Sequence, residues 1–132
     1  MPLLVEEAST PSMQRAYDAD PAVAAWWATP IECASALGRR ERGGEIEPEA
    51  LESSLARLTE LQGRWLEIDP SDSLRRAALR LVRVHDVRAA DAFQLAAAIV
   101  ASEERPETLE LVTLDERLAL AASREGFPIL SG

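Results

Sequence analysis

Short apolar runs alternate with helix-forming segments along this chain, and that alternation is the feature that most constrains its fold. Runs of strand length occur at residues 23–28, 64–68, 109–113 and 127–130. Helical patterns stand between them, and few signals typical of β-hairpins connect them. Strands joined in this way form a parallel sheet with helices on both faces. The sequence therefore predicts an α/β fold, whose functional groups gather beyond the carboxyl ends of the strands.

Capping residues predict where the helices begin. Thr29 and Glu32 match the T-x-x-E capping box at a helix start. Asp69 is predicted to cap a later helix, and Asp86 the helix after that. We expect helices from Thr10–Pro11 onward, from 29 to the pair Gly43–Gly44, from Pro48 to about Gln62, from Pro70 to about Val84, over 88–100, and from 115 to Gly126.

Length and composition indicate the class of protein. The 132 residues are 47% hydrophobic and show no break in composition, which suits a single domain over residues 1–132. No apolar run approaches the roughly 20 residues that cross a bilayer, and the start is not typical of a secretory signal. The single cysteine, Cys33, cannot form an internal disulfide and is expected to be buried. We therefore expect a cytoplasmic protein with no membrane partner.

The charge balance limits how the chain could bind nucleic acid. The net charge is −9, and all 14 basic residues are arginines. Such a chain cannot capture nucleic acid through a broad basic surface. A nuclease whose own acids hold metal ions is still compatible, because the metals supply local positive charge. Arg76, Arg80 and Arg83 share a helix face, which we interpret as a solvated face in preference to a contact with RNA phosphates or an acidic partner segment.

Three carboxylates stand out, and each also has a structural interpretation. Glu32 completes a capping box, and Asp115 could cap the helix that follows it. Asp91, in the first turn of an apolar helix, is favoured there by the helix dipole, but Asp86 is better placed as the cap. Clustered carboxylates repel one another unless a divalent cation lies among them, and Mg²⁺ and Mn²⁺ prefer oxygen ligands. The functional hypothesis is that the three acids converge on a metal.

Three segments carry a family resemblance: TPIECASAL, VRAADAFQLAAAI and LVTLDERLALAASREGFPIL, in that order. They resemble the PIN-domain family, most closely its bacterial VapC-type toxins, and cover the chain from about 29 to 130. The R-A-x-D-A part is the most specific. The resemblance implies a three-layer α/β/α sandwich around a central parallel sheet. It also implies hydrolysis of RNA phosphodiester bonds with Mg²⁺ or Mn²⁺.

The resemblance further implies roles for particular residues. The family's metal-binding and catalytic acids fall on Glu32, Asp91 and Asp115. Thr113 is the nearby hydroxyl, and Arg88 would pair with a carboxylate or contact substrate phosphate. Relatives usually pair with an antitoxin protein and often form homodimers. The helices around Ala34–Arg42 and Pro48–Gln62 would face the antitoxin.

The start of the chain departs from the family. PIN domains normally begin with a central strand ending in D-x-S or D-x-T, whose aspartate is a principal metal ligand. MPLLVEEAST contains no such motif. We therefore expect the central strand to be missing and ribonuclease activity to be weak or absent. The alternative is a non-catalytic PIN-like module that acts through homodimer or antitoxin binding. A flavodoxin-like receiver would need a lysine, which this chain lacks.

Two further features have plain interpretations. Trp26 and Trp27 are neighbours in an expected strand, so their side chains point to opposite faces and both can be core residues. The sequence gives no support for a base-stacking role. His85 has neither a second histidine nor a cysteine pair beside it in the sequence, which makes it a poor zinc ligand candidate.

Overall fold

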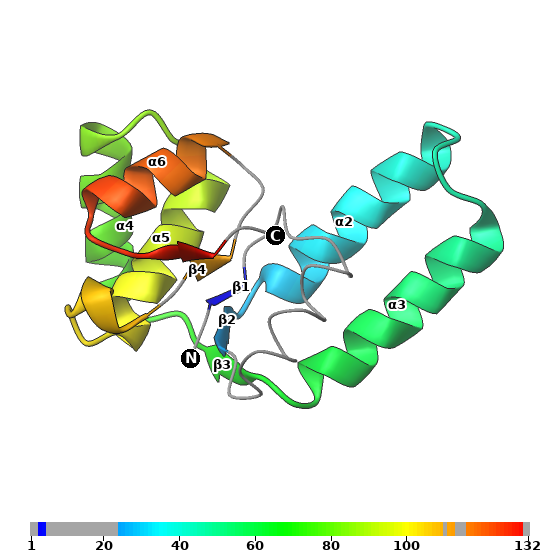
Figure 1. Cartoon of the computed structure of the whole chain (residues 1–132), viewed down its shortest axis with the longest axis horizontal. Helices are drawn as coiled ribbons and strands as arrows, with labels where there is room; N and C mark the ends of the chain where they lie inside the picture. The colour runs from blue at the N-terminus through cyan, green and yellow to red at the C-terminus, as the bar shows by residue number, and fades with distance from the viewer. Residues whose placement is uncertain (1–2, 5–23, 110, 113–115, 131–132) are drawn as a thin grey trace.

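The computed structural model describes residues 3–4, 24–109, 111–112 and 116–130. Strands and helices alternate along these segments, as the sequence predicts (Figure 1). The elements are β1 Leu3–Leu4, β2 Ala24–Trp26, α2 Thr29–Arg42, α3 Pro48–Gln62, β3 Leu66–Ile68, α4 Asp72–Val84, α5 Ala89–Ala101, a short 3-10 helix at Pro106–Thr108, β4 Leu111–Val112, α6 Glu116–Arg124 and β5 Ile129–Leu130. The helix expected to begin at Thr10 and Pro11 lies outside the described residues.

The strands form one parallel sheet in the order β3-β2-β1-β4-β5. Its centre is β1, where Leu3 pairs with Ala24 on one side and with Leu111 on the other. The expectation that the central strand is missing is therefore wrong. A gap between β2 and β4 would leave backbone N–H and C=O groups unpaired inside the protein, which is costly. The short apolar segment Leu3–Leu4 fills that gap.

Helix α5 lies at the centre of the packing, which explains its alanine-rich sequence. It packs along α4 and also contacts β2, β3 and α6. A helix covered on several sides must be apolar around most of its circumference, and alanines let its neighbours approach closely. The largest fully buried side chains among the described residues, two of them on α5 itself, are Leu74, Leu81, Leu95, Leu111, Leu118 and Gln94.

The remaining helices, α2 and α3, pack on each other and extend away from the sheet as a pair (Figure 1). The turn between them begins at Gly43, the C-cap of α2, and Gly44 has a φ of 77°, which favours glycine. The bounds of α3 match the prediction. Helices α4, α5 and α6 form one helical layer beside the sheet. The three-layer sandwich expected from the sequence needs a second layer of helices on the opposite face of the sheet, and that layer stays a prediction.

The start of α4 differs from the prediction. Ser71, in extended backbone, is the N-cap, and its hydroxyl accepts a hydrogen bond from the Leu74 N–H at 3.1 Å. The helix therefore begins at Asp72, and the prediction that Asp69 caps it is wrong. Both residue types are good N-caps, so the backbone conformation at Ser71 decides which of them aims an oxygen at the first turn.

Candidate functional site

The start of α2 does not form the expected capping box. Ala28 occupies the N-cap position, and Thr29 is already helical. The Thr29 side chain is fully buried, and its Oγ1 accepts a hydrogen bond from Gln94 Nε2 at 3.3 Å. Because Thr29 does not cap the helix, Glu32 is not the partner of a cap. The interpretation of Glu32 as part of a capping box is therefore wrong. Its carboxylate has another contact.

That contact is Gln94, which sequence analysis did not identify. Its Nε2 also donates to Glu32 Oε2 at 3.2 Å, so one amide joins α5 to the first turn of α2. Gln94 is fully buried. Within the described part of the chain, its Oε1 is buried without a hydrogen-bond partner. The sequence signal for Gln94 was a polar residue among the alanines of α5. Buried polar groups normally form hydrogen bonds with a partner.

Asp91 lies in the first turn of the same helix. α5 begins at Ala89 with Arg88 as N-cap, so the expectation that Asp86 caps this helix is wrong. The Asp91 residue is only 4% exposed. Burying a carboxylate is costly unless partners compensate. Residues three apart share a helix face, so Asp91 lies on the face that Gln94 turns toward Glu32. Two of the three proposed acids therefore belong to neighbouring helix starts.

The third acid is not placed. Asp115 and Thr113 lie outside the described residues. Within the segments that the structure does describe, no three histidine, cysteine, aspartate or glutamate side chains form a group that could hold a metal ion. Arg88 is exposed at the start of α5. The convergence of Glu32, Asp91 and Asp115 therefore stays a prediction.

An aromatic cavity of about 630 Å³ opens beside Glu32, between the starts of α2, α4 and α5. Trp26, Trp27 and Phe93 all line it. Trp26 is buried in the core, but Trp27 is 48% exposed, so only one of the two is a core residue. Trp27 stands one residue past the end of β2, in the turn before α2, so the alternation of side chains along a strand does not apply to it.

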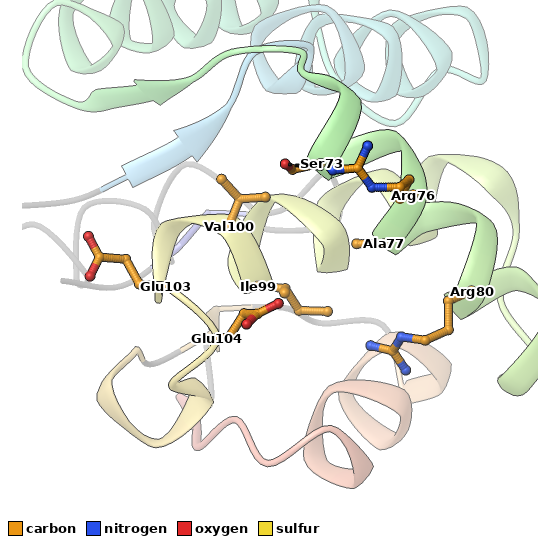
Figure 2. A pocket seen from close by; sticks show the side chains of 8 residues that line it. All are labelled: Ser73, Arg76, Ala77, Arg80, Ile99, Val100, Glu103 and Glu104. Atoms are coloured by element: carbon orange, nitrogen blue, oxygen red, sulfur yellow. Dashed lines mark hydrogen bonds between the residues drawn. The ribbon is translucent and has the colours of Figure 1, made fainter.

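A second groove, of about 550 Å³, lies at the other end of α5 (Figure 2). Arg76 and Arg80 line it from α4, and Glu103 and Glu104 line it from the turn that follows α5. Ile99, which lines this groove, lies eight residues along α5 from Asp91, or about 12 Å of helix. Its mixed charges and its position make it no part of the acidic site.

The side chain of Glu125 connects the end of α6 to α4 and to His85, which follows α4. Both terminal nitrogens of Arg80 donate hydrogen bonds to the Glu125 carboxylate, at 2.7 and 3.1 Å. His85 Nε2 lies 2.7 Å from Glu125 Oε2. The hydrogen bond from Arg80, assisted by His85, holds the pKa of Glu125 below its ordinary value. Arg76, Arg80 and Arg83 are all exposed, as the interpretation as a solvated face predicts, and Arg80 in addition pairs with Glu125. The cluster is structural and lies outside the acidic site.

The fold and the acid pair define an α/β protein with carboxylates at helix starts beside a parallel sheet. Solved structures share this architecture. PAE2754 from Pyrobaculum aerophilum has a TM-score of 0.66 and 18% identity over 98% of this chain and 90% of that one. FitAB, solved with an IR36 DNA fragment, has a TM-score of 0.61 and 14% identity over 99% of this chain and 94% of that one. FitAcB from Neisseria gonorrhoeae has a TM-score of 0.52 and 18% identity over 98% of this chain and 96% of that one.

At 14% to 18% identity over nearly the whole of each chain, the likeness is one of fold. The protein described here shares the fold of these solved structures. No protein-family profile and no curated protein matches the chain. Within the described residues, every helix is too short or too polar to cross a membrane.

Proposed function

We propose that this chain is a metal-dependent endoribonuclease and the toxin component of a VapC-type toxin–antitoxin pair. One observation carries the proposal: Asp91 is buried at the start of an apolar helix, and Gln94 on the same face binds Glu32 on the next helix start. Perturbed or buried carboxylates brought together at a sheet edge are typical of functional sites. The likeness of fold to the FitAB and FitAcB toxin–antitoxin pair supports it.

The donor set suits a hard divalent cation. Glu32, Asp91 and Asp115 would supply only oxygen ligands, which Mg²⁺ and Mn²⁺ prefer. The buried Oε1 of Gln94, which has no hydrogen-bond partner within the described residues, could accept from a water molecule in the site. When bound, the ion would supply a nucleophilic water and offset charge on the phosphate. Thr113 would add a hydroxyl, and Arg88 would contact the substrate phosphate.

The same proposal includes protein partners. The pair α2 and α3 extends away from the sheet (Figure 1), and its segments Ala34–Arg42 and Pro48–Gln62 would face an antitoxin. Most side chains along α3 are exposed or half-exposed in the isolated chain, which leaves this surface accessible to a partner. A homodimer is the expected assembly of the toxin itself.

Cleavage of RNA by the unsubstituted chain and by Asp91→Asn tests the ribonuclease. With Mn²⁺ or Mg²⁺ present, we expect Asp91→Asn to cleave at least about 10- to 100-fold more slowly, because weakening a metal site costs that much. Asp86→Asn, which changes an exposed aspartate just before α5, is the matched control and should cleave like the unsubstituted chain. Equal rates for Asp91→Asn and the unsubstituted chain would remove Asp91 from the site.

A second candidate is a non-catalytic PIN-like module that acts by binding a partner. The absence of a D-x-S or D-x-T motif after Leu3–Leu4 favours it. This candidate predicts no heat of Mn²⁺ binding in a calorimetric titration. It also predicts an oligomer or antitoxin complex that survives replacement of Glu32, Asp91 and Asp115 together. Mn²⁺ binding that Asp91→Asn weakens would exclude it.

A further inference from the structure

The aromatic cavity beside Glu32 has exposed rings that the acidic site does not explain. Large aromatic side chains are usually covered in a protein of this size, because burying them stabilises the fold. Here Trp27 is 48% exposed and Phe93 is 39% exposed, and both line the same cavity. Glu32 lines it too. Exposed rings therefore adjoin one of the proposed metal ligands.

The ring geometry is ordered. Trp26 and Phe93 are stacked, with ring centroids 5.6 Å apart and planes inclined by 11°. Trp26 is buried, which holds the plane of Phe93 in place. A flat ligand that enters the cavity would meet rings whose orientation the core already determines, so it would order few side chains on binding.

One of the charged side chains around the cavity suits a nucleotide phosphate. Arg75, in the first turns of α4, is the one cationic residue among the described residues that line it. Glu32 and Asp72 stand elsewhere on the wall and would repel a phosphate, so a phosphate would lie toward Arg75. The volume of about 630 Å³ lies within the range of small-molecule sites.

Net charge points to the same ligand. A chain with a net charge of −9 and no lysine has no broad basic surface from which to draw affinity for RNA. Stacking of unpaired bases on aromatic rings is the other general source of affinity for single strands. Bases in a duplex are already stacked and paired, so this source selects single-stranded substrate.

We propose that the cavity lined by Trp26, Trp27 and Phe93 is a subsite for an unpaired nucleobase of single-stranded RNA. The base stacks against the exposed rings, and its phosphate lies toward Arg75. The inference rests on the proposed ribonuclease function, because it makes this base a neighbour of the phosphate held at the acids. Trp27 is then a substrate-binding residue.

Fluorescence anisotropy with a labelled single-stranded decauridylate tests the subsite. Asp91→Asn is used throughout, so that the RNA stays intact. We expect Trp27→Ala to weaken binding by about 5- to 100-fold, the usual effect of removing one stacked ring. Trp27→Tyr keeps an aromatic ring and should restore most of the affinity. Leu79→Ala is the matched control, because Leu79 is 60% exposed on α4 and lies outside the cavity lining.

An abasic oligonucleotide of the same length separates base from phosphate. The protein that retains Trp27 should bind the abasic oligonucleotide about as weakly as Trp27→Ala binds decauridylate. Trp27→Ala should not weaken binding of the abasic oligonucleotide any further. Undetectable binding of decauridylate, or equal binding by Trp27→Ala, overturns the subsite. Conversion of an oligomer to a monomer by Trp27→Ala also overturns it, because the rings then cover a protein interface.

These outcomes are independent of the ribonuclease test. If Asp91→Asn stops Mn²⁺-dependent cleavage but Trp27→Ala leaves binding unchanged, the subsite fails and the proposed function stands. If the unsubstituted chain never cleaves RNA but binds it through Trp27 and the base, the subsite stands and the ribonuclease fails.

Discussion

Gln94 on α5 donates its side-chain amide to Glu32 on α2 at 3.2 Å, across 62 residues of sequence. The same nitrogen also reaches Thr29 Oγ1 at 3.3 Å. One buried amide therefore joins the starts of two helices. The carboxylate of Glu32 and the turn that carries Asp91 are held together by a residue that carries no charge of its own.

Gln94→Leu should show whether Gln94 positions the Glu32 carboxylate or only contributes to the stability of the fold. Without the amide, Glu32 loses a donor that orients its carboxylate, so we expect Mn²⁺ affinity or RNA cleavage to fall by about 10- to 100-fold, as for other residues that orient metal ligands. Calorimetry with Mn²⁺ measures the affinity, and urea unfolding measures the stability separately. Gln62→Leu, at the exposed end of α3, is the control and should change neither. Unchanged Mn²⁺ affinity and cleavage in Gln94→Leu would show that Gln94 only packs.

Leu81→Ala and Leu79→Ala test the core beneath α4. Leu81 is fully buried, whereas Leu79 on the same helix is 60% exposed. We expect Leu81→Ala to lower the free energy of unfolding by about 2–5 kcal/mol, because the cavity it leaves cannot be refilled. Leu79→Ala should change it by less than about 0.5 kcal/mol. Urea unfolding monitored by circular dichroism compares them, and equal losses would contradict the packing of α4 on α5.

Glu125→Gln should make stability less dependent on pH. The pKa of Glu125 lies below its ordinary value of 4.5, mainly because Arg80 donates hydrogen bonds to the carboxylate. A carboxyl group with a lowered pKa in the folded state stabilises the fold above its unfolded pKa, and that contribution is lost as the pH falls through the folded value. At neutral pH we expect Glu125→Gln to cost about 1–2 kcal/mol, because Arg80 is half exposed and solvent weakens the pair.

Urea unfolding at several pH values measures this difference. The gap between Glu125→Gln and the unsubstituted chain should shrink as the pH is lowered from neutral to below 4.5. Glu60→Gln is the control, because Glu60 pairs with Arg57 and Arg64 on an exposed face and such pairs contribute little. A gap that keeps its size down to about pH 3 would show that packing, not charge, is responsible.

Ser71→Ala tests the observed start of α4. The Ser71 hydroxyl accepts the Leu74 N–H, so its loss should cost about 1 kcal/mol of stability. Ser73→Ala changes the same residue type two positions later, inside the helix. It should cost less, because the hydrogen bond that Ser73 accepts comes from the exposed Arg76. Thermal unfolding of both variants decides the matter. A larger loss in Asp69→Ala than in Ser71→Ala would restore Asp69 as the cap.

Features that depend on neighbours in sequence could be predicted well. The bounds of α3 and the glycine at 126, with a φ of 99°, follow from local periodicity and from glycine's tolerance of positive φ. The errors at Thr29, Asp69 and Asp86 have a common cause. Each residue type is a good cap, but the local backbone and the packing of the helix start decide which oxygen is used. No local pattern distinguishes these cases.

The alternation of apolar runs and helical segments by itself determined a parallel α/β fold, because only that arrangement pairs the strands and covers their apolar faces. It also marked Asp91 as a carboxylate with little structural reason to be where it is. Tertiary structure alone decided that Leu3–Leu4 complete the centre of the sheet and that Gln94 meets Glu32. It alone left Trp27 uncovered beside them. Such contacts join segments far apart in the chain, and periodicity within one segment carries no information about which surface it will meet.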